Sequence, residues 1–168
     1  MTLVGRVVQL PEAVGQALEH LFGRRVDHVR IIEHSLFVRL HGRAVVTTRR
    51  RCIYLRSSAA DFFDNPWLML HEYWHVIGQW ESRTLTVRNY LAECVRRGYW
   101  NNRFEVEARA FADAHVHQLR AMLSRQAAAV GPAGVLNSAP AASTAAGTGP
   151  ALAVNPTAPR GGTGGQRS

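Results

Sequence analysis

Residues 65–80 read NPWLMLHEYWHVIGQW, and this stretch carries the strongest structural signal in the chain. Asn65 followed by Pro66 is typical of a helix start, because an Asn side chain caps the first turn and proline fits the first helical position. Apolar residues then recur at the spacing of one helical face, among them Leu70, Trp74 and Ile77. The stretch therefore predicts a helix from about residue 66 to 80.

Within this helix, His71-Glu72-Tyr73-Trp74-His75 forms an H-E-x-x-H pattern. Two histidines four positions apart project from the same side of a helix, so they can occupy two corners of a zinc tetrahedron. Glu72 lies on the neighbouring strip of the helix surface, where it could act as general base without binding the metal itself. The pattern predicts His71 and His75 as ligands of Zn²⁺ and Glu72 as the catalytic residue. The competing interpretation is two ordinary histidines on an amphipathic helix.

A catalytic zinc site needs a third protein ligand, and three acids are candidates. Glu81 fits a short zincin spacing after the second histidine, although that pattern normally ends in His or Asp. Glu105 and Glu107 lie on a later predicted helix. Glu105 is preferred, because Ala108 and Ala112 lie on its side of that helix and would allow close packing against the histidine helix. Glu81 and Glu107 stay open as alternatives.

The rest of the chain predicts an α+β fold. One N-terminal helix and several short β-prone segments precede the histidine helix, and two more helices follow it, which makes three helices after a small antiparallel sheet. The predicted helices cover residues 11–23, 66–80, 84–97 and 103–125, and the predicted strands cover residues 26–32, 36–40, 44–48 and 52–56.

Composition changes sharply after residue 126. Of the 42 residues from 127 to 168, 32 are Ala, Gly, Pro, Ser or Thr, and none is acidic or aromatic. Such a segment cannot bury enough apolar surface to offset the entropy of ordering. We therefore expect one folded domain over residues 1–126 and a disordered Ala/Gly/Pro-rich tail over residues 127–168.

At these residues the chain resembles a known family. The similarity covers roughly residues 10 to 125 and is carried by Phe22-Gly23, Val29-Arg30, Ala44 to Thr47, Ile53-Tyr54-Leu55, His71 to Val76 and Glu105-Val106-Glu107-Ala108. It resembles zincin-like metallopeptidase domains whose genes often lie beside extracellular contractile injection systems, and more distantly other gluzincins. The resemblance implies a zincin-like fold, with His71, His75 and Glu105 as zinc ligands and Glu72 as general base.

The sequence departs from this family at Arg109, where the family tends to have Asp or Asn that orients a ligating histidine. Two functions follow as hypotheses. The leading one is a zinc metallopeptidase that cleaves protein or peptide substrates, with the segment 52–56 as an edge strand holding the substrate. The alternative is a catalytically silent, zinc-stabilised adaptor or cargo module that interacts with injection-system components. Tyr90, Tyr99 and Trp100 could supply a transition-state hydrogen bond or a wall of the substrate site. Nothing in their spacing selects one of them, so packing in the core is the default expectation.

The formal net charge is +8, and all 20 basic residues are arginine. The high pI of about 10.9 suggests a basic nucleic-acid-associated protein as a third and weaker hypothesis. The charge is diffuse, however, and nucleic acid is a disfavoured partner. The run Arg49-Arg50-Arg51, with Arg56, could contact phosphates or an acidic partner, or form a solvated turn. No apolar run reaches the roughly 18–20 residues of a membrane span, and no secretory signal is visible. The expected location is therefore the cytoplasm, with export by a non-classical route as an alternative, and the oligomeric state is left open.

Overall fold

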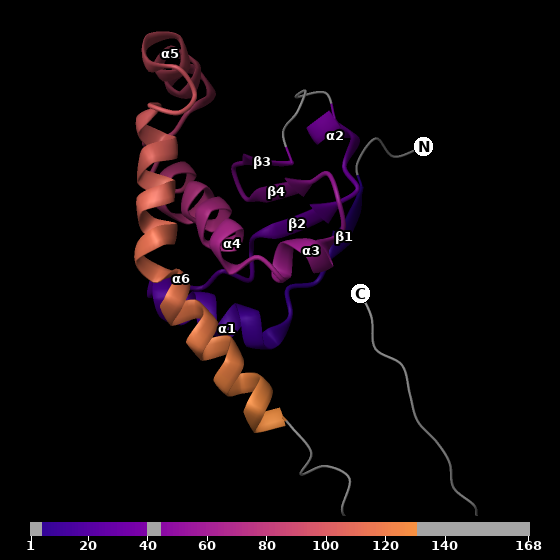
Figure 1. Ribbon diagram of the computed structural model, residues 1–168. Helices are drawn as coiled ribbons and strands as arrows, with labels where there is room; N and C mark the ends of the chain where they lie inside the picture. Colours follow the sequence, from indigo (N-terminus) through magenta and orange to yellow (C-terminus); the bar gives the residue numbers. More distant parts are fainter. Residues whose placement is uncertain (1–4, 40–44, 131–168) are drawn as a thin grey trace, which may run out of the picture. The chain divides into compact units, whose positions relative to one another are not determined.

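The computed structural model describes residues 5–39 and 45–130, all of which lie in one unit, Met1–Gly134. It is a mixed α+β arrangement, as the sequence predicts (Figure 1). In chain order the elements are β1 (Arg6–Val8), α1 (Glu12–Phe22), β2 (Arg30–Glu33), α2 (Leu36–Arg39), β3 (Val46–Arg49), β4 (Cys52–Leu55), α3 (Ala59–Phe63), α4 (Pro66–Tyr73), the π-helix η1 (Trp74–Trp80), α5 (Val87–Arg97) and α6 (Arg103–Val130).

The four strands form one sheet in the order β1-β2-β4-β3. β1 pairs antiparallel with β2, and β3 pairs antiparallel with β4, but the central pair β2 and β4 is parallel. The expectation of a purely antiparallel sheet is therefore wrong, because the chain crosses over through α2 and β3 before it pairs with β2 again. The expected edge strand at residues 52–56 is also wrong: β4 is an inner strand, and β3 is the edge.

Several short elements differ from the prediction. The segment 36–40 was expected as a strand, but Leu36–Arg39 forms the helix α2, and residue 40 lies outside the described residues. The first predicted strand begins later than expected, at Arg30. The predicted strand 44–48 becomes β3, whose first expected residue also lies outside the described part. The strand β1 and the helix α3 were not predicted.

The histidine helix begins where the sequence predicts. Asn65 caps α4, its side chain accepting a hydrogen bond of 3.1 Å from the backbone N–H of Leu68, and Pro66 occupies the first turn. From Trp74 onward the chain continues as the π-helix η1, in which the N–H of Glu81 bonds to the carbonyl of Val76 at 3.0 Å. π-Helical turns are rare and occur frequently at functional sites.

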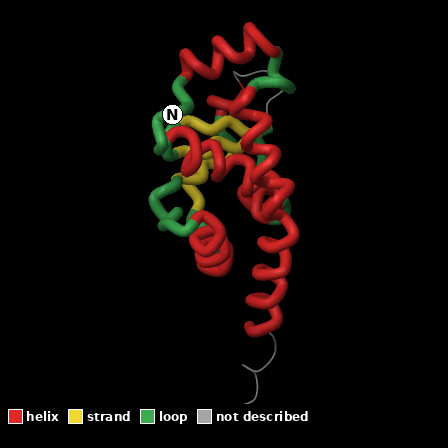
Figure 2. Tube along the Cα trace, turned by 90° about the vertical axis from the view of Figure 1, so that its left-hand side faces the viewer, coloured by secondary structure: helices red, strands yellow, loops and turns green. Residues whose placement is uncertain are grey.

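The core lies between the sheet and the helices. α4 contacts α6 along its length and also contacts α3 and the edge strand β3, while α1 contacts α6. Figure 1 shows α4 running between α6 and the sheet, and in Figure 2 the strands, in yellow, lie among these helices. The buried cluster draws on all of them, with Leu18 from α1, Ile31 from β2, Leu70 from α4 and Leu119 from α6. This packing places the histidine helix between the edge strand and α6.

α6 is longer than predicted and runs to Val130. The first four residues of the predicted tail are therefore helical, because Ala127, Ala128 and Ala129 have the highest helix propensity and extend an existing helix. The remainder of the predicted tail lies outside the described residues. Within the described part, none of the helices has the length and apolarity needed to cross a membrane.

Candidate metal centre

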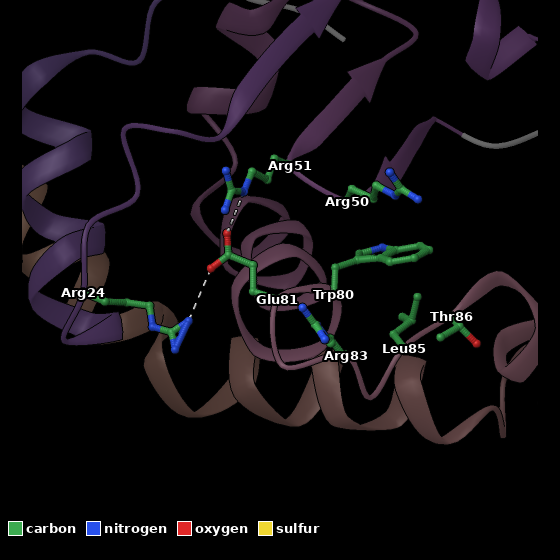
Figure 3. A pocket seen from close by; sticks show the side chains of 8 residues that line it. All are labelled: Arg24, Arg50, Arg51, Trp80, Glu81, Arg83, Leu85 and Thr86. Carbon is green, nitrogen blue, oxygen red and sulfur yellow. Dashed lines mark hydrogen bonds and ion pairs between the residues drawn. The ribbon is translucent and has the colours of Figure 1, made fainter.

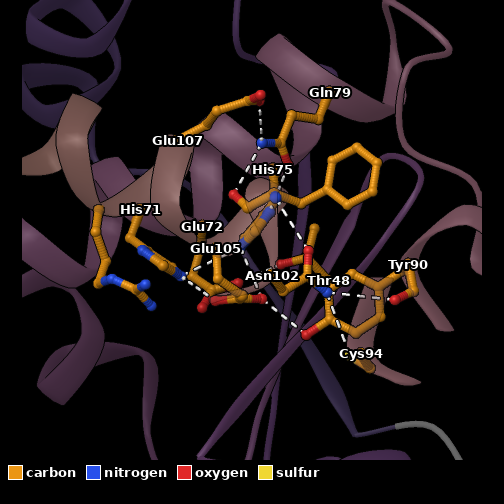
Figure 4. Close-up of polar contacts among 12 residues, drawn as sticks. Thr48, His71, Glu72, His75, Gln79, Tyr90, Cys94, Asn102, Glu105 and Glu107 are labelled. Atoms are coloured by element: carbon orange, nitrogen blue, oxygen red, sulfur yellow. Dashed lines mark hydrogen bonds and ion pairs between the residues drawn. The ribbon is translucent and has the colours of Figure 1, made fainter. Parts of the chain in front are cut away.

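Two histidines and one glutamate converge at the junction of α4, η1 and α6 (Figure 4). His71 lies in the last turn of α4 and His75 in the first turn of η1. Their Nε2 atoms are 3.1 Å apart. From the first turn of α6, the Glu105 carboxylate reaches both rings, with Oε2 3.4 Å from His71 Nε2 and Oε1 3.6 Å from His75 Nε2. The structure thus brings together all three residues predicted as ligands.

The spacing of these donor atoms fits a single metal ion. In a tetrahedral site with metal–nitrogen bonds of about 2.0–2.1 Å, neighbouring ligand atoms lie about 3.3 Å apart. The two Nε2 atoms are 3.1 Å apart, and one ligand atom from each of the three residues lies within 4.8 Å of the others. Glu105 Oε2 is buried and has no hydrogen-bond partner among the described residues. A buried carboxylate oxygen without a partner is costly unless something satisfies it. This buried His/His/Glu group could therefore hold a metal ion, and its imidazole and carboxylate donors suit zinc and similar transition metals.

Within this group, Glu105 and His75 shift each other's pKa. Burial alone would raise the pKa of Glu105, but the neighbouring rings of His71 and His75, together with the charge of His75, hold that pKa well below its usual range. Burial would lower the pKa of His75, but its hydrogen bond with Glu105 and the negative charge of Glu72 raise that pKa overall. Glu105 is therefore ionised despite being only 4% exposed. An ionised carboxylate beside two imidazoles is the donor set that a divalent cation needs.

Glu105 reaches the histidines because of how α6 begins. The fully buried Asn102 accepts a hydrogen bond of 3.0 Å from the N–H of Phe104 and donates to the carbonyl of Tyr90 at 3.3 Å, which fixes the start of the helix. Ala108 and Ala112 are fully buried on the face that contacts α4. These small residues allow the two helices to approach closely, as the sequence predicts.

The two alternative acids lie elsewhere. Glu81 projects away from the histidine pair and bonds with His28 at 2.5 Å and Arg24 at 3.3 Å. Glu107 accepts a hydrogen bond of 3.0 Å from the Gln79 side chain, so it lies behind the site (Figure 4). Neither acid belongs to the described group of potential metal ligands.

Gln79 supports the site and was not predicted. Its Oε1 is 2.8 Å from His75 Nδ1, and it is 1% exposed. Its Nε2 donates to the carbonyl of Phe104 at 2.9 Å and to Glu107, so the amide is fixed in the orientation that places its oxygen toward His75. A ligating histidine that donates its other N–H to such an oxygen is held in the correct tautomer. The signal in the sequence was the position of Gln79, four residues after His75.

Arg109 does not enter the metal group. Its guanidinium lies 5.5 Å from the centre of the Trp100 ring and donates a hydrogen bond to the Trp100 carbonyl. The Nδ1 atom of His75 has its hydrogen-bond partner in Gln79 Oε1. The departure at Arg109 therefore does not remove the orienting contact.

Glu72 lies in a cleft that opens onto the histidines. This metal cleft has a volume of about 450 Å³ and is lined by β3, by the histidine helix and by α5. Glu72 is 7% exposed, and its Oε2 accepts a hydrogen bond from the hydroxyl of Thr48 on the edge strand. Thr48 was not singled out in the sequence, because only the fold brings β3 beside the helix. The predicted general base thus faces the same open space as the ligands.

Two tyrosines line the metal cleft rather than the core. Tyr90 donates a hydrogen bond of 2.8 Å from its hydroxyl to Glu105 Oε1, and burial and the Glu105 charge raise the pKa of Tyr90. Tyr99 is 54% exposed, and burial and the same carboxylate raise its pKa also. Trp100 is 72% exposed. The expectation that these three aromatics pack in the core is therefore wrong.

No protein-family model, no curated protein and no solved structure matches the chain.

Proposed function

We propose that the protein is a zinc-dependent metallopeptidase with a zincin-like domain. In this proposal His71, His75 and Glu105 hold the zinc ion, and Glu72 is the general base. The observation that supports it most directly is the closeness of the two imidazole Nε2 atoms, 3.1 Å apart, to the Glu105 carboxylate, whose Oε2 lies 3.4 Å from His71 Nε2 and whose Oε1 lies 3.6 Å from His75 Nε2. These groups line a cleft that also holds the carboxylate of Glu72. Catalytic zinc sites have three protein ligands and leave a further position open for water or substrate, and His71, His75 and Glu105 all line the cleft.

Zinc, when bound, supplies Lewis-acid chemistry that polarises the carbonyl of a peptide bond and makes water more acidic. Glu72 would accept the proton of the attacking water and deliver it to the amine that leaves. The Thr48 hydroxyl donates to Glu72 Oε2 and so holds the carboxylate against the edge strand. Tyr90, kept protonated by its raised pKa, donates to Glu105 and keeps that ligand in place.

The edge strand offers a place for the substrate. Among residues 5–39 and 45–130, β3 pairs with β4 alone, so its other edge carries backbone groups that can bind an extended peptide. Val46, Thr47, Thr48 and Arg49 all line the metal cleft. A peptide added to β3 would lie with its backbone beside Glu72, which is the geometry that attack on a peptide bond requires.

The proposal is tested on the full-length chain by measuring bound zinc and cleavage of an unfolded protein such as casein. Glu72→Gln is expected to bind zinc as the wild type does and to lose about a hundredfold or more of the activity. Glu12→Gln, the same substitution at the start of α1, is the matched control and should retain full activity.

Equal activity in Glu72→Gln and wild type would remove this mechanism, and absence of zinc from both would remove the site. A chain that binds zinc, gains thermal stability from it and cleaves nothing would support the alternative, a zinc-stabilised adaptor or cargo module.

A further inference from the structure

A second cleft, of about 710 Å³, adjoins the metal cleft (Figure 3). Four arginines line it, from three separate parts of the chain, together with the indole of Trp80 and the carboxylate of Glu81. We call it the arginine cleft, defined by Arg24, Arg50, Arg51, Trp80, Glu81 and Arg83.

The arginine cleft has more positive charge than its own acid can neutralise. Glu81 pairs with Arg24 at 3.3 Å and with Arg51 at 3.6 Å, and both ion pairs are drawn in Figure 3. Arg50 and Arg83 are exposed, and no ion pair to either occurs among the described residues. A recess with a concentrated excess of one charge attracts ligands of the other sign.

Both of these unpaired arginines occupy an unfavourable backbone conformation. Arg50 has a φ of 51° and Arg83 a φ of 61°, the left-handed region that glycine and asparagine adopt far more readily. Arg50 lies in the tight turn between β3 and β4, where a short polar residue or glycine is the usual choice. The requirements of the turn alone do not explain arginine there, whereas a use for the side-chain charge does.

The arginine cleft is continuous with the metal cleft. Trp80 and Leu85 line both. The edge strand leads from one to the other: Thr48 bonds to Glu72 in the metal cleft, and the strand ends at Arg49, directly before Arg50. Arg49, the last residue of β3, lies about 3.3 Å along the strand from Thr48, and Arg50 follows it as the first residue of the turn. A peptide bound along β3 therefore reaches the arginine cleft within two or three residues of its reacting bond.

We propose that the arginine cleft binds an acidic side chain of the peptide substrate, so that the protein selects segments with Asp or Glu two or three residues from the cleaved bond. This inference rests on the proposed peptidase function. The carboxylate would pair with Arg50 and Arg83, and its methylene groups would contact Trp80. A peptide suits this recess better than a nucleic acid does, because the cleft extends a groove bordered by a sheet edge and contains a carboxylate of its own.

The test measures binding separately from cleavage. Two fluorescent ten-residue peptides, one with Asp and Glu near its centre and one with Asn and Gln instead, are titrated with the full-length chain in EDTA. The acidic peptide is expected to bind about tenfold more tightly. Arg50→Asn/Arg83→Asn should abolish this preference, since Asn tolerates a positive φ and leaves the melting temperature unchanged within a few degrees. Arg96→Gln/Arg125→Gln, which removes two exposed charges from α5 and α6, should retain it.

Equal binding of the two peptides would overturn the proposal. It would also be overturned if both double variants lost the preference for the acidic peptide equally, because the preference would then depend on overall charge. A single-stranded oligonucleotide that binds more tightly than the acidic peptide and depends on Arg50 and Arg83 would also overturn it. If Arg50→Asn/Arg83→Asn has a lowered melting temperature, the binding of the two peptides is compared in Arg83→Asn alone.

The peptidase proposal is judged by zinc-dependent cleavage of casein. If the acidic peptide binds more tightly but casein is not cleaved, the cleft binds peptides and the peptidase function is rejected. Cleavage without acid preference would reject the inference alone.

Discussion

The metal group and the arginine cleft lie next to each other, but they differ in how exposed their charged side chains are and in how far these charges are balanced. His71, His75 and Glu105 are each less than 8% exposed, and the negative charge of the Glu105 carboxylate faces ring nitrogens of both histidines at 3.4 and 3.6 Å. In the arginine cleft the side chain of Arg51 is 70% exposed, and positive charge exceeds negative. A buried group whose charges are balanced within the protein has fixed geometry. It selects the ion it binds by the size of the site and by the kind of donor atoms. A group of exposed side chains with excess charge selects its ligand by charge, and salt weakens the binding of that ligand.

The largest expected effect comes from removing the acidic ligand. Glu105→Gln should lower zinc affinity by more than a hundredfold, because the amide replaces a buried anionic donor that both histidines face. Glu81→Gln is the matched control in the arginine cleft and should leave zinc affinity unchanged. Competition with a chromophoric zinc chelator measures both. The assignment of the third ligand would be wrong if Glu81→Gln had the larger effect.

A smaller effect is expected from the residue that orients His75. Gln79→Ala should weaken zinc binding by about 10- to 100-fold, since supporting hydrogen bonds of this kind carry that much metal affinity. Arg109→Gln should change it less than twofold, because Arg109 contacts Trp100 and not the metal group. The same chelator competition applies. A larger loss in Arg109→Gln than in Gln79→Ala would show that the orienting contact has been misassigned.

Salt should separate the two regions further. Raising sodium chloride from 50 to 500 mM is expected to weaken binding of the acidic peptide roughly five- to tenfold, because the arginines that attract it are exposed and screened. Zinc affinity should change less than twofold over the same range, since the ligands are buried. Peptide anisotropy and chelator competition are measured in the same buffers. Peptide binding that is indifferent to salt would argue against recognition by charge.

The smallest effect concerns Glu33, a buried carboxylate that belongs to neither region. It accepts a hydrogen bond of 2.8 Å from the N–H of Ala59 and another of 2.7 Å from Arg6, and these lower its pKa. The unfolded chain then binds the proton more readily than the folded one. The stabilisation is complete above the unfolded pKa of about 4.3 and is lost as the pH falls through the lower folded pKa.

Glu33→Gln should therefore be less stable than the wild type at pH 7, and the difference should narrow below about pH 4. Urea midpoints at both pH values measure it. A difference that stays constant with pH would mean that the contacts of Glu33 do not depend on its charge.

The parts of the site that follow a local rule could be predicted from the sequence. Asn65 and Pro66 start a helix for reasons confined to one turn, and His71 and His75 share a face because of helical periodicity. Glu105 was preferred because small residues lie beside it, and α6 does pack on α4, with Ala108 and Ala112 fully buried.

The remainder depends on contacts between distant segments. Thr48 meets Glu72 only because β3 becomes the sheet edge, and that edge position follows from the parallel pairing of β2 with β4. Leu36–Arg39 carries alternating apolar residues that suit a strand, yet it forms a single helical turn inside the crossover. The π-helical turn that contains His75 and Gln79 has no local sequence rule that would reveal it.

The central claim is that two imidazoles and one carboxylate hold a single metal ion. X-ray absorption at the zinc edge, on the full-length chain loaded with one equivalent of zinc, tests this most directly. The account predicts nitrogen and oxygen neighbours at about 2.0–2.1 Å with the outer-shell scattering of two imidazoles. Sulfur at about 2.3 Å, which would come from Cys52 or Cys94, or a spectrum without imidazole scattering, would contradict it.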